Sequence, residues 1–186
     1  RDIFGWTMPA SYFQSFNPVF VVVFAPLMSW LWLKLGSKNM EPASPTKQAM
    51  GLFLLSVGYL VIALGVHGVE PGVKVSIMWL TGLYFIHSMG ELMLSPIGLS
   101  MVNKLAPIRF ASLLMGIWYL SMATANKFAG MLSGLYPEAG KPKSFIGFEI
   151  ATMYDFFMLF VIISGVAAVI LFGLSKWLQK LMHGVR

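Results

Sequence analysis

The side chains best suited to chemistry lie in one apolar segment, residues 76–102, in which Glu91 is the only charged residue. A carboxylate within hydrocarbon is costly, so such a residue usually binds, pairs or carries a proton. His87, Glu91 and Ser95 are spaced by four residues, which places them on one face of a helix. Burial disfavours an ionised carboxylate and a nearby ammonium favours it, so Glu91 could exchange a proton for a cationic group. The alternative interpretation is a structural hydrogen bond from a neighbouring helix to Glu91.

Three residues weaken the helices near this carboxylate. Pro96 cannot donate a hydrogen bond to the carbonyl of Leu92, which loosens the helix one turn beyond Glu91. Gly98 weakens the same helix, and Gly116 weakens the facing part of the next one. Because helices with interrupted hydrogen bonding bend at low cost, the pattern predicts a gate formed by these two helices.

Asn17 and Trp118 are candidates in two other apolar runs. Asn17 precedes Pro18, which leaves the carbonyl of Gln14 without its helical donor, so Asn17 could face a water-filled cavity. Its alternative role is to satisfy that broken backbone. Trp118 lies deeper than the interfacial belt that tryptophans usually occupy. It is interpreted either as lining a cavity or as packing against lipid or core.

The remaining polar side chains within or near the apolar runs have simpler interpretations. For Lys127 we expect snorkelling toward the interface or helix pairing, with direct substrate contact as the alternative. We expect Asp155 to be solvated or to cap a helix, and His87 to pack or form a hydrogen bond. The His and carboxylate positions show no metal-ligand spacing, and no nucleophile–base motif or phosphate loop is present. No metal or cofactor is therefore predicted, and an intramembrane enzyme is disfavoured.

The composition is that of an integral membrane protein. The 186 residues are 58% hydrophobic and 11% charged, whereas soluble domains contain about 25% charged residues. The net charge of +6 comes from Lys and Arg in short connections between apolar runs, which membrane topology explains better than nucleic-acid binding. The absence of cysteine excludes disulfides and thiol catalysis.

Five runs are long enough to span a membrane, which takes roughly 20 apolar residues. They predict an all-α, polytopic membrane helix bundle with spans at about 10–33, 49–66, 76–102, 110–136 and 152–174. Residues 137–142 are expected to form a loop, followed by a short interfacial stretch to about 149, and the last span continues into an amphipathic end at 176–180.

The charge distribution predicts how these spans are oriented. An odd number of spans places the two termini on opposite sides. One side carries eight Lys and Arg residues and the other carries four, so the positive-inside rule puts the first side, with the carboxyl end, in the cytoplasm. The richer side holds Lys34, Lys38, Lys47, Lys104, Arg109, Lys176, Lys180 and Arg186, and the poorer side holds Arg1, Lys74, Lys141 and Lys143. Because the chain begins at Arg1 without an initiator Met, we expect a piece of something longer.

Three motifs resemble one transporter family. The string FQSFNPVF at 13–20 resembles the eighth helix of proton-dependent oligopeptide transporters, the peptide branch of the major facilitator superfamily. The run from Gly90 to Ser100, followed by Leu-Ala-Pro at 105–107, is similar to the tenth helix. The string MGIWYL at 115–120, with Asn126-Lys127, is similar to the eleventh. The resemblance extends from about residue 12 to about residue 180.

The resemblance implies helices 8–12, most of the carboxyl-terminal half of a major facilitator fold, with the amino-terminal helices absent from this chain. It implies a proton-coupled symporter of di- and tripeptides in a bacterial inner membrane, working by alternating access with protons as the coupling ion. Asn17 and Glu91 would hold the peptide amino group, Ser95 and Trp118 would line the site, and Glu91 would couple to protons. A membrane-embedded assembly subunit remains an alternative, as does a transporter of the same fold for another small substrate.

Overall fold

The computed structural model describes residues 2–3, 6–7, 10–69, 73, 75–137, 143–145 and 147–182, with side chains from residue 12 onward. Arg1, Lys74, Lys141 and Arg186, which entered the predicted charge count, lie outside the described residues. Five described helices are long and apolar enough to cross a membrane, which confirms the predicted all-α, polytopic bundle. The helices are α1 Ala10–Gln14, α2 Phe16–Ser37, α3 Ser44–Val66, α4 Ile77–Leu105, η1 Ile108–Phe110, α5 Ala111–Ser133 and α6 Met153–Leu181. The strands are β1 Asp2–Ile3, β2 Trp6–Thr7, β3 Lys143–Phe145 and β4 Phe148–Ile150.

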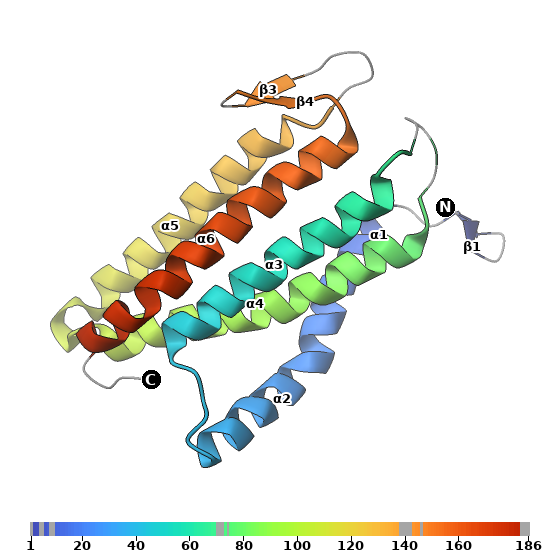
Figure 1. Cartoon of the computed structure of the whole chain (residues 1–186). Coiled ribbons are helices and arrows are strands. Elements are labelled where there is room, and N and C mark those ends of the chain that lie inside the picture. The colour runs from blue at the N-terminus through green and yellow to red at the C-terminus, as the bar shows by residue number, and fades with distance from the viewer. Residues whose placement is uncertain are drawn as a thin grey trace.

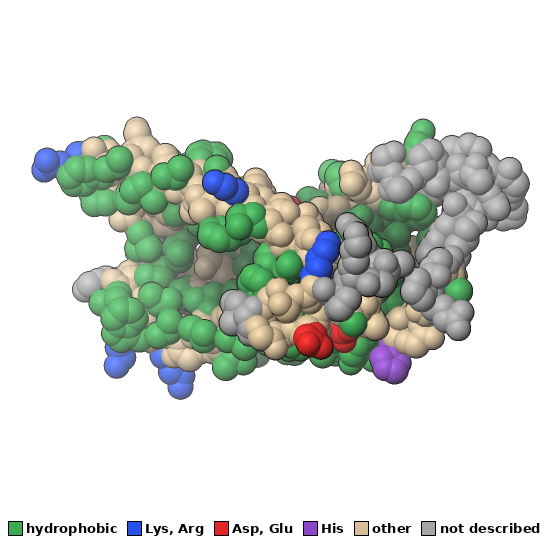
Figure 2. Space-filling model, turned by 90° about the horizontal axis from the view of Figure 1, so that it is seen from above, with side chains coloured by type: hydrophobic (Ala, Val, Ile, Leu, Met, Phe, Trp, Pro, Cys, Tyr) green, Lys and Arg blue, Asp and Glu red, His purple; other side chains and the backbone are tan. Residues whose placement is uncertain are grey.

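The bundle is built around α3 and α4. Helix α3 packs along both α4 and α6, while α2 packs on α4 and diverges from α3 toward its carboxyl end (Figure 1). Helix α5 contacts α4, and no residue of α5 is buried. The face seen in Figure 2 carries mostly hydrophobic side chains and few charged ones, as a surface in contact with lipid would.

The first span is interrupted one turn before Pro18. Helix α1 ends at Gln14 and α2 begins at Phe16, because the carbonyl of Gln14 has lost the amide donor that a residue other than proline would supply at position 18. The amide of Ser15 instead donates to the carbonyl of Tyr12 at 3.1 Å. Helix α4, by contrast, continues through Pro96 from Ile77 to Leu105 without an assigned break.

A partly buried ion pair joins the connection after α2 to the first turns of α3. Lys47 is 7% exposed and pairs with Glu41, and its ammonium lies 4.7 Å from the centroid of the Trp32 ring. A Cβ at Gly36 would come within 2.9 Å of the Glu41 carboxylate, so a glycine leaves the space that this carboxylate needs. Helix α3 starts at Ser44, five residues before the predicted span, and therefore includes Lys47.

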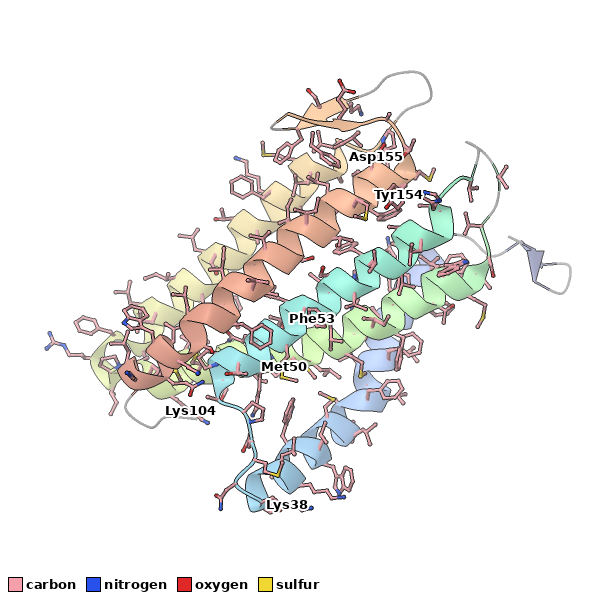
Figure 3. The ribbon with its side chains drawn as sticks, viewed as in Figure 1. Lys38, Met50, Phe53, Lys104, Tyr154 and Asp155 are labelled. Atoms are coloured by element: carbon pink, nitrogen blue, oxygen red, sulfur yellow. The ribbon has the colours of Figure 1, made fainter. Side chains whose placement is uncertain are left out.

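The segment before α6, which is expected to be a short interfacial stretch, contains an antiparallel hairpin formed by β3 and β4. Gly147, with φ 79°, occupies the turn between the strands, a conformation that glycine adopts at low cost. Thr152 and Asp155 then form a capping box at the start of α6, which confirms the capping interpretation of Asp155. Figure 3 places Tyr154 and Asp155 at one end of the bundle and Lys38 and Lys104 at the other.

Candidate functional site

A hydrogen bond between Asn17 and Glu91 joins α2 to α4. The Asn17 amide nitrogen donates to Oε2 of Glu91 at 2.8 Å. Asn17 is the second residue of α2, directly after the helix break, and Glu91 lies in the middle of α4. Among the described residues Glu91 makes no other hydrogen bond or ion pair. The carboxylate therefore has acceptor capacity left for a further donor.

Ser88 sets the orientation of the Asn17 amide. Its hydroxyl oxygen lies 2.5 Å from Oδ1 of Asn17 and 2.7 Å from the carbonyl oxygen of Tyr84. Ser88 is fully buried, at 0% exposure. Because its hydroxyl can donate to Oδ1, the amide oxygen turns toward Ser88 and the amide nitrogen turns toward the carboxylate of Glu91.

Asn17 and Glu91 line a cavity of about 320 Å³ between α2, α3 and α4. Its lining contains the three residues predicted to share one helix face, and the side chains are Asn17, Leu55, Tyr84, His87, Glu91, Leu94 and Ser95. The wall is thus part apolar and part polar, with one carboxylate, one amide, one imidazole and the hydroxyls of Tyr84 and Ser95. Such a cavity can receive a small ligand that carries a hydrogen-bond donor or a cation.

His87 packs and hydrogen-bonds, as expected. Its Nε2 lies 3.2 Å from the carbonyl oxygen of Leu55, and its ring centroid lies 4.5 Å from that of Tyr59. The ring also covers Gly58, where a Cβ would come within 2.4 Å of the imidazole. His87 therefore fastens α4 to α3 beside the cavity.

Trp118 lines a different pocket from the one that Asn17 and Glu91 line. This second pocket, of about 310 Å³, is almost wholly apolar and lies between the carboxyl end of α4 and the first half of α5. The side chains that line it are Met101, Val102, Leu105, Ala106, Leu114, Ile117, Trp118 and Ser121. Trp118 contacts α4 at Gly98, one turn beyond Ser95. Because Ser95 lines the cavity beside Glu91, Trp118 lies close to that cavity as well as lining the apolar pocket.

The three predicted gate residues have different surroundings. Gly98 is buried against the Trp118 ring, Pro96 is exposed, and a Cβ at Gly116 would meet nothing within 4 Å. Lys127 is exposed on α5 and lines neither the cavity beside Glu91 nor the apolar pocket beside Trp118.

Sequence reasoning missed Ser88 and Tyr84. Ser88 lies three residues before Glu91 and Tyr84 lies seven before it, so both fall on the helix face that carries the carboxylate. That spacing was available in the sequence. Within the described part of the chain, no group of three His, Asp or Glu side chains is placed to hold a metal ion.

Comparison with known proteins places these motifs in one family. The model of the POT family (PTR2) matches residues 1–146. The chain is 36% identical over 182 residues to "Uncharacterized transporter YclF" of Bacillus subtilis, an alignment that covers 97% of this chain and 34% of that protein. It is 32% identical over 186 residues to a "Di-/tripeptide transporter" of Lactococcus lactis subsp. cremoris, covering 98% of this chain and 34% of the relative.

Solved structures agree with the sequence comparison. The crystal structure of a mutant peptide transporter POT in complex with alafosfalin superposes with a TM-score of 0.82 at 33% identity. The match covers 98% of this chain and 35% of that structure. The chain thus spans about a third of the length of the curated relatives and solved structures that it matches.

Proposed function

The chain belongs to the POT family, whose model matches residues 1–146, and from this membership we propose that it forms part of a proton-coupled symporter of di- and tripeptides. The printed name of the Lactococcus relative, a di-/tripeptide transporter, supports this choice of substrate. The five long apolar helices support an integral membrane protein. We place it in a bacterial inner membrane with its carboxyl end in the cytoplasm, and we assign it no catalytic activity.

The observation that carries the proposal is the hydrogen bond of 2.8 Å between Asn17 and Glu91 at the cavity wall. A peptide ammonium needs acceptors in a site of low dielectric constant, and a carboxylate beside an amide oxygen can supply them. When the ammonium enters, Glu91 accepts a hydrogen bond from it, and the Asn17 amide oxygen, which Ser88 holds in place, can accept a second one through its other lone pair. Ser95 lines the same cavity and contributes a hydroxyl.

We propose that proton coupling depends on whether the Glu91 carboxyl group is protonated or ionised. An ammonium beside a carboxylate favours the ionised form of the acid. We propose that Glu91 carries a proton when the cavity holds no cation and gives it up when a peptide ammonium binds, so that peptide binding releases a proton. Net symport then needs a second acceptor that takes protons from outside, in helices equivalent to the part of the relatives that this chain does not match.

For alternating access, we propose a gate between α4 and α5 on the cytoplasmic side of Glu91. In this proposal the Trp118 ring, which lies against Gly98 and lines the apolar pocket, forms the boundary, and movement of α5 relative to α4 opens or closes it. Pro96 and Gly116 are the positions at which the two helices bend. Trp118 also bounds the space for a peptide side chain, so Trp118→Ala should alter both the transport rate and the peptide preference.

Uptake of labelled dipeptide by proteoliposomes tests this function, with the protein in its natural full length and an imposed pH gradient, acid outside. Concentrative uptake that collapses with a protonophore is the expected result. Uptake of another small solute in place of peptides would indicate a different substrate on the same fold. Absence of any gradient-driven uptake would favour the assembly-subunit interpretation.

A further inference from the structure

Helix α5 is held in the bundle by few contacts. Its described residues include none that is buried, and α4 is the only long helix it contacts closely. Along its first half the contact runs through the Trp118 ring against Gly98. Helix α5 has 23 residues and carries Trp118, the proposed gate residue. Trp118 can act as a gate only if the helix keeps a defined position.

The outer end of α5 is fastened by the hairpin rather than by another helix. The ammonium of Lys143, the first residue of β3, donates to the carbonyl oxygen of Gly134 at 2.8 Å and to that of Tyr136 at 3.1 Å. Carbonyls at a helix carboxyl end lack intrahelical donors and carry partial negative charge, so a lysine there is stabilising. One side chain thus ties the end of α5 to the hairpin.

The hairpin is in turn fixed to α6. Ile150 of β4 is fully buried and packs with the buried side chains of Phe156 and Leu159 of α6. Leu135, two residues after the end of α5, packs against the same cluster. The Tyr136 ring lies 5.5 Å from the Phe156 ring, and its hydroxyl lies 3.6 Å from the sulfur of Met153. Figure 1 shows the hairpin lying over the adjacent ends of α5 and α6.

We propose that Lys143 is a positioning residue for transport, one that anchors the outer end of α5 to α6 through the hairpin, so that α5 pivots there and moves at its Trp118 end. This inference rests on the proposed transport function. It follows from the asymmetry of the contacts, because the outer end is cross-linked by hydrogen bonds and a packed cluster. The Trp118 end contacts α4 beside an apolar pocket, and none of its side chains is buried there.

Three variants of the full-length protein test this role. Lys143→Met removes the hydrogen bonds donated to Gly134 and Tyr136, Lys143→Arg keeps a cationic donor, and Lys176→Met removes an exposed lysine from α6 as the matched control. Because Asn17 and Glu91 lie on α2 and α4, peptide affinity should be unchanged in all three. The maximal uptake rate should fall several-fold in Lys143→Met alone, with recovery in Lys143→Arg.

Spin-label distances supply a readout that does not depend on transport. Cysteines at Ser133 and Ile162 report the outer halves of α5 and α6, and cysteines at Leu113 and Leu174 report the cytoplasmic halves; residues 1–186 contain no competing thiol. In the unsubstituted protein, peptide should shift the cytoplasmic distance and leave the outer distance unchanged. Lys143→Met should broaden the outer distribution, and Lys143→Arg should restore it.

Two results would overturn the inference. An outer distance that is unaffected by Lys143→Met would show that the hairpin does not anchor α5. Equal losses of peptide affinity, maximal rate and folded protein would show a general structural role. If the unsubstituted protein carries no peptide, the proposed function fails, while the outer distance in Lys143→Met still decides whether this residue anchors α5.

Discussion

The indole ring of Trp118 lies directly against the backbone of Gly98. A Cβ at Gly98 would come within 2.5 Å of the ring carbon Cη2 and within 3.2 Å of the side-chain nitrogen of Gln48. Backbone and ring therefore meet where α4 and α5 approach each other, next to the apolar pocket that Trp118 lines. The contact depends on the absence of a side chain at position 98.

Gly98→Ala should displace the Trp118 ring and disturb the gate. We expect a lower maximal rate of uptake and little change in affinity for a peptide with small side chains such as dialanine, because the added methyl group lies outside the cavity that holds Glu91 and small side chains do not reach Trp118. Gly173→Ala on α6 is the matched control, since a Cβ there would meet nothing within 4 Å. Measurement of uptake rate and binding affinity side by side checks this. Equal rates in the two variants would argue against a gate at this contact.

Ser88→Ala should weaken peptide binding without unfolding the bundle. The substitution removes the hydroxyl that lies 2.5 Å from Oδ1 of Asn17, so the amide loses the partner that orients it. We expect a loss of about 1 kcal/mol, close to fivefold in affinity. Ser164→Ala serves as the control, because Ser164 is also buried and its hydroxyl bonds only within α6. Calorimetric titration with dipeptide measures the difference, and identical affinities would remove Ser88 from the site.

Glu41→Gln should destabilise the protein at the connection between α2 and α3. The buried ammonium of Lys47 would lose its counter-charge, which we expect to lower the free energy of unfolding by about 1–3 kcal/mol. This cost is smaller than that of breaking a fully buried ion pair, because the Glu41 side chain is 32% exposed and water already screens the pair. Lys47→Met combined with Glu41→Gln should recover part of the loss. Thermal unfolding in detergent measures both, with Glu149→Gln on the hairpin as an exposed control. A Glu41→Gln protein as stable as the control would show that the pair is not stabilising.

Much of the bundle could be predicted because membrane spans are set by long apolar runs. The five spans, the common face of His87, Glu91 and Ser95, and the cap at Asp155 all follow from spacing or local chemistry, and the structure contains each of them. The helix break before Asn17 follows from the missing amide of Pro18.

Other features depend on contacts between distant segments and could not be read from local pattern. The β3–β4 hairpin is short, and its strands are held by packing on α6 as well as by their own ladder. Lys47 was assigned to a connection, but the Glu41 carboxylate and the Trp32 ring allow it to lie buried within α3. The contact between Trp118 and Gly98 could not be predicted without knowing how α4 and α5 cross.

The most direct test of the proposed mechanism is peptide affinity measured as a function of pH in the unsubstituted protein and in Glu91→Gln. If peptide binding releases a proton from Glu91, affinity should rise with pH until Glu91 is already ionised in the empty protein. Gln keeps the shape and can hydrogen-bond to Asn17, but it neither titrates nor carries charge. We therefore predict weaker binding in Glu91→Gln, an affinity nearly independent of pH, and loss of most gradient-driven uptake. Unchanged affinity with an unchanged pH profile would contradict the mechanism and leave Glu91 as a structural partner of Asn17.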